Sequence, residues 1–588
     1  MNTNIFSKLT SEKEVGRLKR MIMRDPVYTE SVMRIRKKMN NHAEAHGAMP
    51  TNPEMLVLYD ELIKEGKEEE SAQVRQILKR LKVRSNSGVA VVSLLTKPYT
   101  CPGRCIYCPT EKNMPKSYLS REPAAARALT NRFDPYKQIT MRLKALTMNG
   151  HPIDKVEMIF IGGTFNYYPR EYQEWFTKES FRACNNWGLE KDDANFINAD
   201  HGLSLVDLQN INETVRARII GLSIETRPDY INALELKYLR YLGVTKVEIG
   251  VQHLDDGVLA FNKREMTESN IAECSEMLRD YGYKIVYHMM PNLPSSDRVM
   301  DVQMFRDLYS GLYHHPDMMK VYPCMTVRGS MLYKLYTQRK IDYIPYNDQI
   351  LTEVLADCEK EVKPYTRLIR VIRDIPADYI VAGSRKSNLR EIVDQYQRDR
   401  GYKQIDIRAR EVRDGEIDVK DFELTETVYE TAHGTEYFLQ FENIKDNKLA
   451  GFLRLRLPND KSLVLNKNQD NITSNEGNPN WGLDKWLAKS KEELKDVVGL
   501  NDIDETLHSA ALVRELHVYG TMKRVGEEGS QSQHTGMGKA LLAKAESIAV
   551  AHNYKKVAII SGVGVRDYYR KRGYKLENTY MVKHFTIK

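Results

Sequence analysis

The stretch T-C-P-G-R-C-I-Y-C-P, residues 100–109, carries Cys101, Cys105 and Cys108, three of the seven cysteines in the chain. Three thiolates at C-x3-C-x2-C spacing on a short loop can each bind a different iron of one [4Fe-4S] cubane. The fourth iron is then left open to a small molecule. A structural zinc site would need four closed ligands, and no second pair of cysteines at C-x2-C spacing occurs in the chain. We therefore predict an iron-sulfur cluster with one open iron.

Length and composition indicate a soluble protein with several domains. The chain has 588 residues, of which 41% are hydrophobic and 29% charged, so it is too long for a single hydrophobic core. No apolar run reaches the roughly 20 residues of a membrane span, and the N-terminus lacks the apolar segment of a secretory signal. We therefore expect a cytoplasmic protein that does not bind a membrane. The odd number of scattered cysteines argues against a disulfide framework. The net charge of +8 is a weak indication of nucleic-acid binding.

Short apolar runs recur on both sides of the cysteine loop. They begin at residues 89, 156, 219, 247, 285 and 320, and helical patterns separate them. Branched apolar runs that alternate with amphipathic segments predict a parallel sheet with crossover helices. Six such units predict an α/β fold, a partial (β/α)6 barrel that is open at its side.

Glycines and polar residues follow the ends of these predicted strands, where barrels of this kind place their chemistry. Glycine lets the backbone approach a ligand closely, and charged side chains can hold polar groups of a ligand. Each such residue alone is commonly part of a turn or of a solvated surface, so only the set is informative. The candidates for binding a ligand beside the cluster are Gly162, Gly163, Thr164, Glu225, Arg227, Gln252 and His288.

A second module is predicted after about residue 400. The run A-L-V-R-E-L-H-V-Y-G from Ala511 predicts a strand, and Q-x-x-G-x-G from Gln533 predicts a turn before a long amphipathic helix. Backbone N–H groups at such a turn can bind a pyrophosphate. A dinucleotide-binding loop is the alternative, but it usually opens a domain, whereas this turn lies near the C-terminus. The candidate ligand-binding residues are Leu516, His517, Val518, Gln533, His534, Thr535, Gly536, Met537, Gly538 and Lys539.

Each module resembles a known family. The cysteine spacing, with Tyr107 before the last cysteine, resembles that of the radical S-adenosylmethionine (radical SAM) superfamily. This resemblance implies that S-adenosylmethionine occupies the open iron and that the residues at the strand ends surround it. The strand, glycine turn and helix near the C-terminus resemble the GNAT acyltransferases, which bind acetyl-coenzyme A. In those proteins a tyrosine at the place of Tyr568 and Tyr569 lies near the thioester sulfur and can donate a proton, although adjacent tyrosines are often only packed.

The two modules in one chain resemble the catalytic subunit of Elongator, the tRNA uridine(34) acetyltransferase family. The resemblance runs from about Arg84 to the C-terminus and includes I-F-I-G-G-T-F, G-L-S-I-E-T-R-P-D-Y-I, V-E-I-G-V-Q-H and G-V-R-D-Y-Y-R-K-R-G-Y. It implies that a deoxyadenosyl radical takes a hydrogen from the acetyl methyl of acetyl-coenzyme A. The resulting carbon radical adds to the wobble uridine of a tRNA anticodon loop, and thioester hydrolysis leaves 5-carboxymethyluridine. Whether the chain pairs with itself or with Elongator-like subunits stays open.

The sequence divides into three expected parts. These are a helical, basic, tRNA-binding region at 1–88, a radical SAM domain with a linker at 89–395, and a GNAT domain at 396–588. Basic clusters at 17–20, 34–38 and 79–84 can neutralise phosphates, although such runs are commonly a solvated helix face. Many members of the family carry a zinc site that uses a cysteine just before R-x-R-E-V. Residues 401–412 contain no cysteine, which argues against this zinc ion and leaves Cys324 as the candidate for a remnant.

Two other functions remain as alternatives to a tRNA-modifying enzyme. One is a protein lysine acetyltransferase that uses the GNAT domain alone. The other is a non-catalytic RNA-binding scaffold with a structural cluster. The three hypotheses differ in whether the cysteines are needed for the reaction and in whether the RNA is changed.

Overall fold

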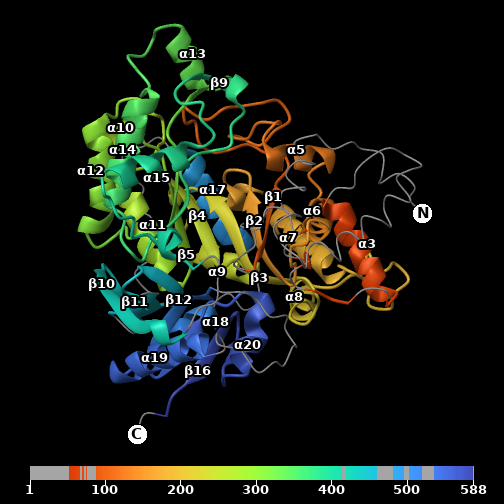
Figure 1. Cartoon of the computed structure of the whole chain (residues 1–588). Coiled ribbons are helices and arrows are strands. Elements are labelled where there is room, and N and C mark those ends of the chain that lie inside the picture. Colours follow the sequence, from red (N-terminus) through yellow and green to blue (C-terminus); the bar gives the residue numbers. More distant parts are fainter. Residues whose placement is uncertain are drawn as a thin grey trace, which may run out of the picture.

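The computed structural model describes residues 52–66, 69–71, 74–75, 78, 88–412, 419–459, 481–494, 502–519 and 536–586. In this part of the chain two seven-stranded sheets form two neighbouring bodies, with helices packed against each (Figure 1). The predicted residues Gln533, His534 and Thr535 lie outside the described residues, as do the basic clusters at 17–20, 34–38 and 79–84. No helix among the described residues is long and apolar enough to cross a membrane.

The first sheet is the predicted partial barrel. Its order is β1-β2-β3-β4-β5-β6-β8, and all neighbours are parallel. The strands are β1 (Ala90–Leu95), β2 (Lys155–Ile161), β3 (Arg218–Thr226), β4 (Lys246–Gln252), β5 (Lys284–Met289), β6 (Met318–Val321) and β8 (Arg367–Arg370). The six predicted strands are confirmed. The seventh, β8, was not predicted because R-L-I-R is too short and too polar to give an apolar run.

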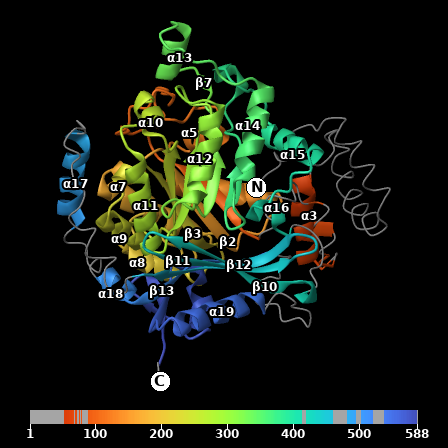
Figure 2. The ribbon, with the colours of Figure 1, turned by 90° about the vertical axis from the view of Figure 1, so that its left-hand side faces the viewer.

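Helices cover the outer face of this sheet and shield its apolar side chains (Figures 1 and 2). The longer ones in this half are α3 (Asn52–Lys64), α6 (Pro135–Met148), α7 (Arg170–Asn185), α11 (Glu268–Asp280), α12 (Arg298–Ser310), α14 (Asp348–Lys360) and α15 (Leu389–Asp399). The shorter ones are α5 (Pro123–Thr130), α8 (Leu205–Asn212), α9 (Ala233–Tyr241), α10 (Asp256–Phe261), α13 (Met331–Thr337) and α16 (Ile407–Arg410). A separate two-stranded pair, β7 (Thr326–Val327) with β9 (Ile380–Ala382), lies near α13.

The second sheet forms the predicted C-terminal domain. Its order is β10-β11-β12-β13-β14-β16-β15. The strands are β10 (Glu423–Thr431), β11 (Gly434–Asn443), β12 (Lys448–Pro458), β13 (Ala510–Val518), β14 (Lys556–Ile559), β15 (Lys575–Glu577) and β16 (Tyr580–His584), and the helices are α17 (Trp481–Leu494), α18 (Asp502–Leu507), α19 (Met537–Ala551) and α20 (Arg566–Arg570). The parallel strands β13 and β14 pair over a short register, from Ala510 opposite Lys556 to Val513 opposite Ile559. Beyond Val513, β13 has no pairing with β14, and α19 packs against β13 and β14.

The C-terminal domain packs against the amino ends of the barrel strands. Arg514 of β13 donates hydrogen bonds to both carboxylate oxygens of Asp317, at 2.7 and 2.6 Å, and to the carbonyl oxygen of Tyr283 at 2.8 Å. Asp317 and Tyr283 directly precede β6 and β5. Arg514 also pairs with Glu436 of β11 at 3.0 Å. Since Arg514, Asp317 and Glu436 are all at most 1% exposed, the two domains share a buried ionic interface.

A second close contact depends on glycine. The 3-10 turn η6 (Val563–Val565) lies against β3, and a methyl group at Gly562 would lie 2.0 Å from the carbonyl oxygen of Ile220. We expect Gly562→Ala to lower the free energy of unfolding by about 1–3 kcal/mol, because the strand must move away. Urea denaturation measures this loss. The control is Gly311→Ala, where no atom lies within 4 Å of the added methyl; equal stability of the two variants would contradict the expected contact.

Candidate active site

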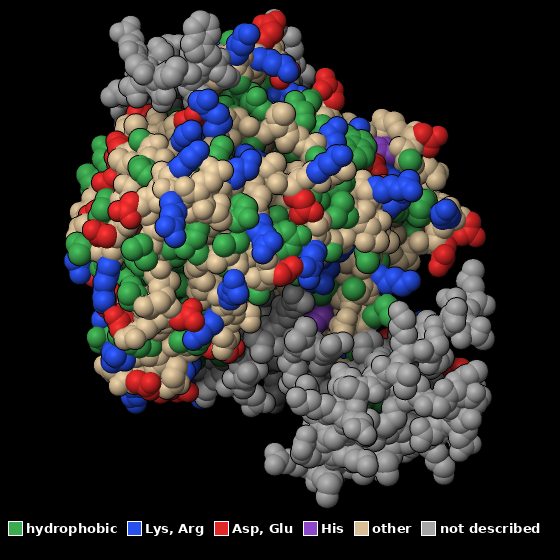
Figure 3. All heavy atoms as spheres, turned by 90° about the horizontal axis from the view of Figure 1, so that it is seen from above, with side chains coloured by type: hydrophobic (Ala, Val, Ile, Leu, Met, Phe, Trp, Pro, Cys, Tyr) green, Lys and Arg blue, Asp and Glu red, His purple; other side chains and the backbone are tan. Residues whose placement is uncertain are grey.

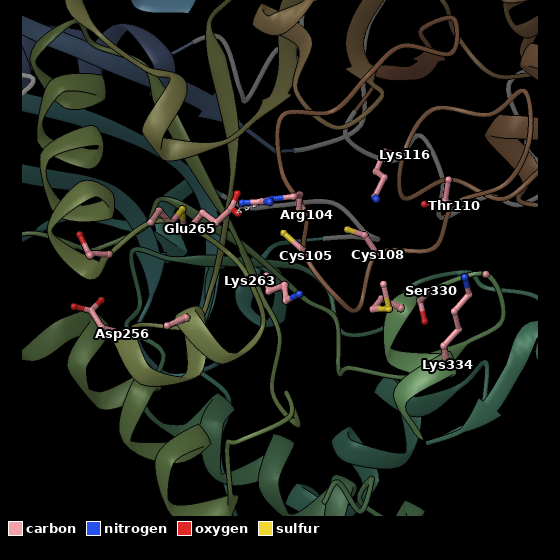
Figure 4. Close-up of a pocket in the computed structure, with 15 residues that line it drawn as sticks. Arg104, Cys105, Cys108, Thr110, Lys116, Asp256, Lys263, Glu265, Ser330 and Lys334 are labelled. Carbon is pink, nitrogen blue, oxygen red and sulfur yellow. Dashed lines mark hydrogen bonds and ion pairs between the residues drawn. The ribbon is translucent and has the colours of Figure 1, made fainter. Parts of the chain in front are cut away.

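The three cysteines lie on one loop that is anchored from both sides. The backbone N–H of Ile106 donates to the carbonyl of Asn262 at 3.1 Å, and the carbonyl of Ile106 accepts from Leu332 at 2.7 Å. The Sγ of Cys101 lies 3.9 Å from the hydroxyl of Thr164, which follows β2. Cys105 and Cys108 point their sulfurs to the same side of the loop (Figure 4). The loop therefore presents its thiols at the carboxyl end of the barrel sheet.

Two buried arginines stand beside Cys105. Arg264 Nη1 lies 3.5 Å and Arg227 Nη1 4.0 Å from its sulfur. A hydrogen bond with Cys108 lowers the pKa of Cys105, burial raises it, and the charges of Arg264 and Arg227 lower it further, so the pKa lies well below its usual value. The same hydrogen bond, together with burial, raises the pKa of Cys108 well above its usual value. Of these two thiols, Cys105 is therefore the one that the arginines favour as the thiolate, the form of cysteine that binds metal.

The residues of this loop fit an iron-sulfur cluster. Among the described residues, the hydroxyl of Tyr107 and the Nε of Arg264 are buried and have no hydrogen-bond partner, so both can still bond to a group held by the loop. The ligand atoms of a single Zn²⁺ lie close to one another. The sulfurs of the three cysteines do not form one of the described groups of ligand atoms that all lie within 4.8 Å of one another. Donors, charge and spacing therefore suit a polynuclear cluster better than one ion.

The predicted glycines after β2 sit beside a predicted carboxylate. Gly162 donates its N–H to Glu225 Oε2 at 3.3 Å, and Tyr118 donates its hydroxyl to the same oxygen at 2.5 Å. Gly162 has φ of 151° and Gly163 has φ of 97°, which residues with a side chain rarely adopt. A methyl group at Gly162 would also lie 1.9 Å from the hydroxyl oxygen of Thr96. Glycine is therefore required where the chain passes Glu225.

Glu225 belongs to a charged group at the strand ends. Its carboxylate, that of Glu248 and the ring of His288 have ligand atoms within 4.8 Å of one another. His288 Nε2 lies 2.9 Å from Glu248, and the ammonium group of Lys320 forms an ion pair with the same carboxylate. Burial raises the pKa of Glu248, but Lys320 and His288 outweigh it and hold the pKa well below its usual value. Because Lys320 already neutralises Glu248, this group suits recognition of a polar ligand better than binding of a metal ion.

Of the remaining predicted residues of the barrel half, some lie at the cysteine loop and one lies at the strand ends. Thr164 and Arg227 face the cysteines, and Arg227 is held there by Asp229, whose Oδ2 accepts from Nη2 at 2.6 Å. Gln252 ends β4 with φ of 71°, and its carbonyl accepts from Met290 at 2.8 Å just after β5. Arg264, Tyr118 and Lys320 were missed. The trace of Lys320 in the sequence is a lone lysine inside the apolar run M-M-K-V, which does not by itself indicate a partner.

Charged side chains continue from this group along the inner face of the barrel. Side chains two residues apart share one face of a strand, and the inner face carries a set that we name the interior charged row: Glu157, Glu225, Lys246, Glu248, Lys284, His288 and Lys320. Lys246 pairs with Glu157, and Lys284 Nζ lies 3.7 Å from Glu515 of β13. Lys246 and Lys284 outweigh the effect of burial on Glu157 and lower its pKa to about 2. The row thus extends from the C-terminal domain to the carboxyl ends of the barrel strands.

The C-terminal domain brings several predicted residues together. Gly536 precedes α19, Lys539 on its first turn is exposed, and Met537 and Gly538 are buried. A methyl group at Gly538 would lie 2.7 Å from the hydroxyl of Tyr568, so this hydroxyl reaches the first turn of α19. Tyr569 is 6% exposed and lies in the core of the domain.

The predicted segment of β13 lies where β13 has parted from β14. Leu516 and Val518 are half-buried beside the core of the domain. The ring of His517 packs against that of Tyr519 at a tilt of 57°, with ring centroids 4.4 Å apart. Burial lowers the pKa of His517 to about 4, so its ring is neutral at physiological pH. Its Nε2 is buried without a partner among the described residues, which leaves it able to bond to a ligand.

The sequence argues against a zinc site because the stretch 401–412, which includes α16, has no cysteine. Gln404 stands in the cysteine-free stretch 401–412 and donates to Glu359 at 3.1 Å, to Asp394 at 2.9 Å and to Gln397 at 2.6 Å. Cys324 is 1% exposed, and burial raises its pKa to about 12. Cys324 does not belong to a described group of three His, Cys, Asp or Glu side chains that could hold a metal ion.

A parallel partial barrel with a three-cysteine loop at the carboxyl ends of its strands defines a radical SAM fold. The model of the Radical SAM superfamily matches residues 96–305, and that of the Radical_SAM C-terminal domain matches residues 316–398. The tRNA uridine(34) acetyltransferase of Methanocaldococcus jannaschii is 36% identical over 89% of this chain and 90% of its own. That of Dehalococcoides mccartyi is 39% identical over 85% and 98%, and Elongator complex protein 3 of Homo sapiens is 34% identical over 86% of each chain.

A solved structure agrees with these sequence matches. Elp3 of Methanocaldococcus infernus, with its N-terminus deleted, aligns with a TM-score of 0.65 and 33% identity, over 85% of this chain and 99% of that one. The chain therefore belongs to the family of the tRNA uridine(34) acetyltransferases and Elongator complex protein 3. The resemblance inferred from the sequence is confirmed.

Proposed function

We propose that the protein modifies the wobble uridine of tRNA, using S-adenosylmethionine and acetyl-coenzyme A to form 5-carboxymethyluridine at position 34. The names of its relatives support a tRNA uridine as the substrate. Cys101, Cys105 and Cys108 would hold a [4Fe-4S] cluster, and Gly162, Gly163, Glu225, Gln252 and His288 would surround S-adenosylmethionine. When bound, these two groups supply the one-electron chemistry that activates the acetyl methyl group.

The interior charged row is the observation that carries the proposal. It extends from Lys284, which lies beside Glu515 and the C-terminal domain, to Glu225 and His288 beside the cysteine loop. Barrel interiors are usually filled by apolar side chains, whereas the charged side chains of this one would offer polar contacts to an arm such as that of a thioester. The row supports transfer of an acetyl group from the C-terminal domain to the radical centre without exposure to bulk water.

Tyr568 and α19 would hold the thioester at the start of this path. Backbone N–H groups at the first turn of α19 can bind pyrophosphate, because a helix N-terminus favours anions. The hydroxyl of Tyr568 lies at the same turn, and burial raises its pKa, so at neutral pH it carries the proton that a leaving thiolate needs. The geometry therefore favours Tyr568 over Tyr569 as the catalytic tyrosine. The uridine would be turned out of the anticodon loop to react, as unpaired RNA bases are.

The test is an assay of the full chain after anaerobic cluster reconstitution. With tRNA, acetyl-coenzyme A, S-adenosylmethionine and a reductant, we expect nucleoside mass spectrometry to detect carboxymethylated uridine at position 34. Tyr568→Phe should lower its yield roughly a hundredfold, since a positioned proton donor contributes about 10²–10⁴. Tyr569→Phe is the matched control and should keep most of the activity. An unchanged anticodon with a verified cluster would contradict the proposal.

A further inference from the structure

A row of aromatic rings lies beside the cysteine loop, and the site described above does not use it. Tyr99 stands between β1 and the loop, two residues before Cys101. The other rings belong to the turn after β2 and to α7. Two segments far apart in the sequence therefore meet at the carboxyl end of β1, the first strand of its sheet. We name this set the aromatic row: Tyr99, Tyr167, Tyr168, Tyr172 and Trp175.

Two buried tyrosines of the row are fixed by the backbone that follows β1. The hydroxyl of Tyr168 donates to the carbonyl of Lys97 at 2.7 Å, and the hydroxyl of Tyr172 accepts from the N–H of Lys97 at 2.9 Å. The two rings stack on each other, with centroids 5.0 Å apart and an angle of 24° between their planes. They are therefore held in place before any ligand binds, which reduces the entropy lost on binding.

Tyr99 extends this stack to the surface. Its ring stacks on Tyr168, with centroids 4.9 Å apart and an angle of 29° between the planes, and yet Tyr99 is 39% exposed. Trp175, at the other end of the row, is 45% exposed. An exposed ring on a fixed stack offers a flat apolar surface on which a further ring can pack. The row therefore favours a flat aromatic ligand.

Positive charge accompanies the row. Lys97 is exposed, and its ammonium group lies 4.5 Å from the centroid of the Tyr172 ring. The carboxyl end of β1 is on the side away from the C-terminal domain, which Figure 3 views from above, and lysine and arginine side chains are spread over the described part of this face. Proteins bind unpaired nucleic-acid strands through such surfaces, because bases stack on the rings and phosphates pair with the cations.

We propose that Tyr99 is a stacking site for an unpaired base of the RNA, next to the base that enters the barrel. The inference rests on the proposed function, which supplies an anticodon loop as the ligand. Turning one uridine out of this loop breaks its stacking on its neighbours. A neighbouring base that stacks on Tyr99 offsets part of this loss and holds the strand close to Cys101. Because every base has a flat face, the site adds affinity without sequence specificity.

The experiment measures binding of a fluorescently labelled RNA hairpin, made of the anticodon stem and loop, to the full-length protein by fluorescence anisotropy. S-adenosylmethionine and acetyl-coenzyme A are left out, so that the RNA offers the only nucleobase. We expect Tyr99→Ala and Tyr99→Leu to weaken binding roughly tenfold, because each loses one base–aromatic stack. Tyr99→Trp should bind as tightly as the wild type, because tryptophan keeps a flat ring where leucine keeps only apolar bulk.

The matched control is Tyr313→Ala, which removes a tyrosine that is 48% exposed in the segment after α12, outside the row. It should bind the hairpin as the wild type does. A fully paired RNA duplex presents no unpaired base and should bind equally to the wild type and to Tyr99→Ala. Equal hairpin affinity of the wild type and Tyr99→Ala, or an equal loss of affinity for the duplex, would overturn the inference.

Salt dependence separates stacking from charge. Lys97→Gln should reduce the slope of log affinity against log salt concentration by about 0.7, the value for one phosphate contact of a single strand. Tyr99→Ala should leave the slope unchanged, and a reduced slope in this variant would contradict stacking. If Tyr99→Ala weakens hairpin binding while the wild type with a verified cluster leaves the uridine unmodified, the proposed function fails and the stacking site stands. If the wild type modifies the uridine and Tyr99→Ala binds equally well, only the stacking site fails.

Discussion

Cys105→Ala is expected to abolish both cluster binding and tRNA modification. Removing this ligand leaves two thiolates, which cannot hold a cubane at three of its irons. Loss of residues that merely support metal ligands costs about 10–100-fold in affinity or activity, so loss of a ligand should cost more than a hundredfold. Iron and sulfide analysis, the electron paramagnetic resonance signal of the reduced protein, and nucleoside mass spectrometry measure these losses.

A second cysteine in the same protein provides the control. Cys274 lies in α11 and is 2% exposed, and it behaves as a small hydrophobic side chain. Cys274→Ala should keep the cluster and the modified uridine, at a modest loss of stability. If Cys105→Ala kept acetyl transfer to a protein lysine at the wild-type rate, and wild-type protein did not change tRNA, the GNAT domain alone would account for the activity. Retention of modified uridine by Cys105→Ala would refute the role of the cluster.

Arg514→Met is expected to lower the free energy of unfolding by about 3–5 kcal/mol. Removing one partner of a buried ionic group leaves buried charge incompletely compensated. Here Asp317 would keep only Arg454 and Glu436 only Arg456 as cationic partners, and both carboxylates are 1% exposed. Urea denaturation measures the loss. Arg298→Met is the matched control, because Arg298 also pairs with two carboxylates, Glu353 and Asp357, but its side chain is 48% exposed. Exposed pairs contribute about 0–1 kcal/mol. A similar loss in both variants would contradict the importance of the interface.

Because of the same interface, we expect the free energy of unfolding to depend on pH in the acid range. Burial raises the pKa of Asp317, but Arg514 and Arg454 outweigh it and hold the pKa well below its usual value. The unfolded chain therefore binds a proton at a higher pH than the folded one, with an unfolded pKa of about 3.9. The stabilisation is complete above that value and is lost as the pH falls through the folded pKa. Arg514→Met should flatten this acid dependence of stability.

Much of the fold was readable from the sequence because its signals are local. Apolar runs and helical patterns predicted six of the barrel strands, the C-terminal strand 510–518 and the helix after the glycine turn. The short strand β8 was missed because its residues are polar and it is specified by its neighbour β6. Lys320 was missed because one lysine in a strand has no meaning until Glu248 and His288 are known to stand opposite it.

The sequence by itself determined the chemistry that the cysteine loop can support, because the spacing of three thiols on a short loop is fixed by the covalent chain. It also determined the class of the barrel module and predicted a second sheet domain after about residue 400, because glycines and apolar runs act over a few residues. Only the tertiary structure decided that Arg264 stands beside Cys105, that Tyr568 rather than Tyr569 reaches α19, and that charges line the barrel from one domain to the other. These are contacts between segments far apart in the chain, and their geometry is set by how the two sheets pack.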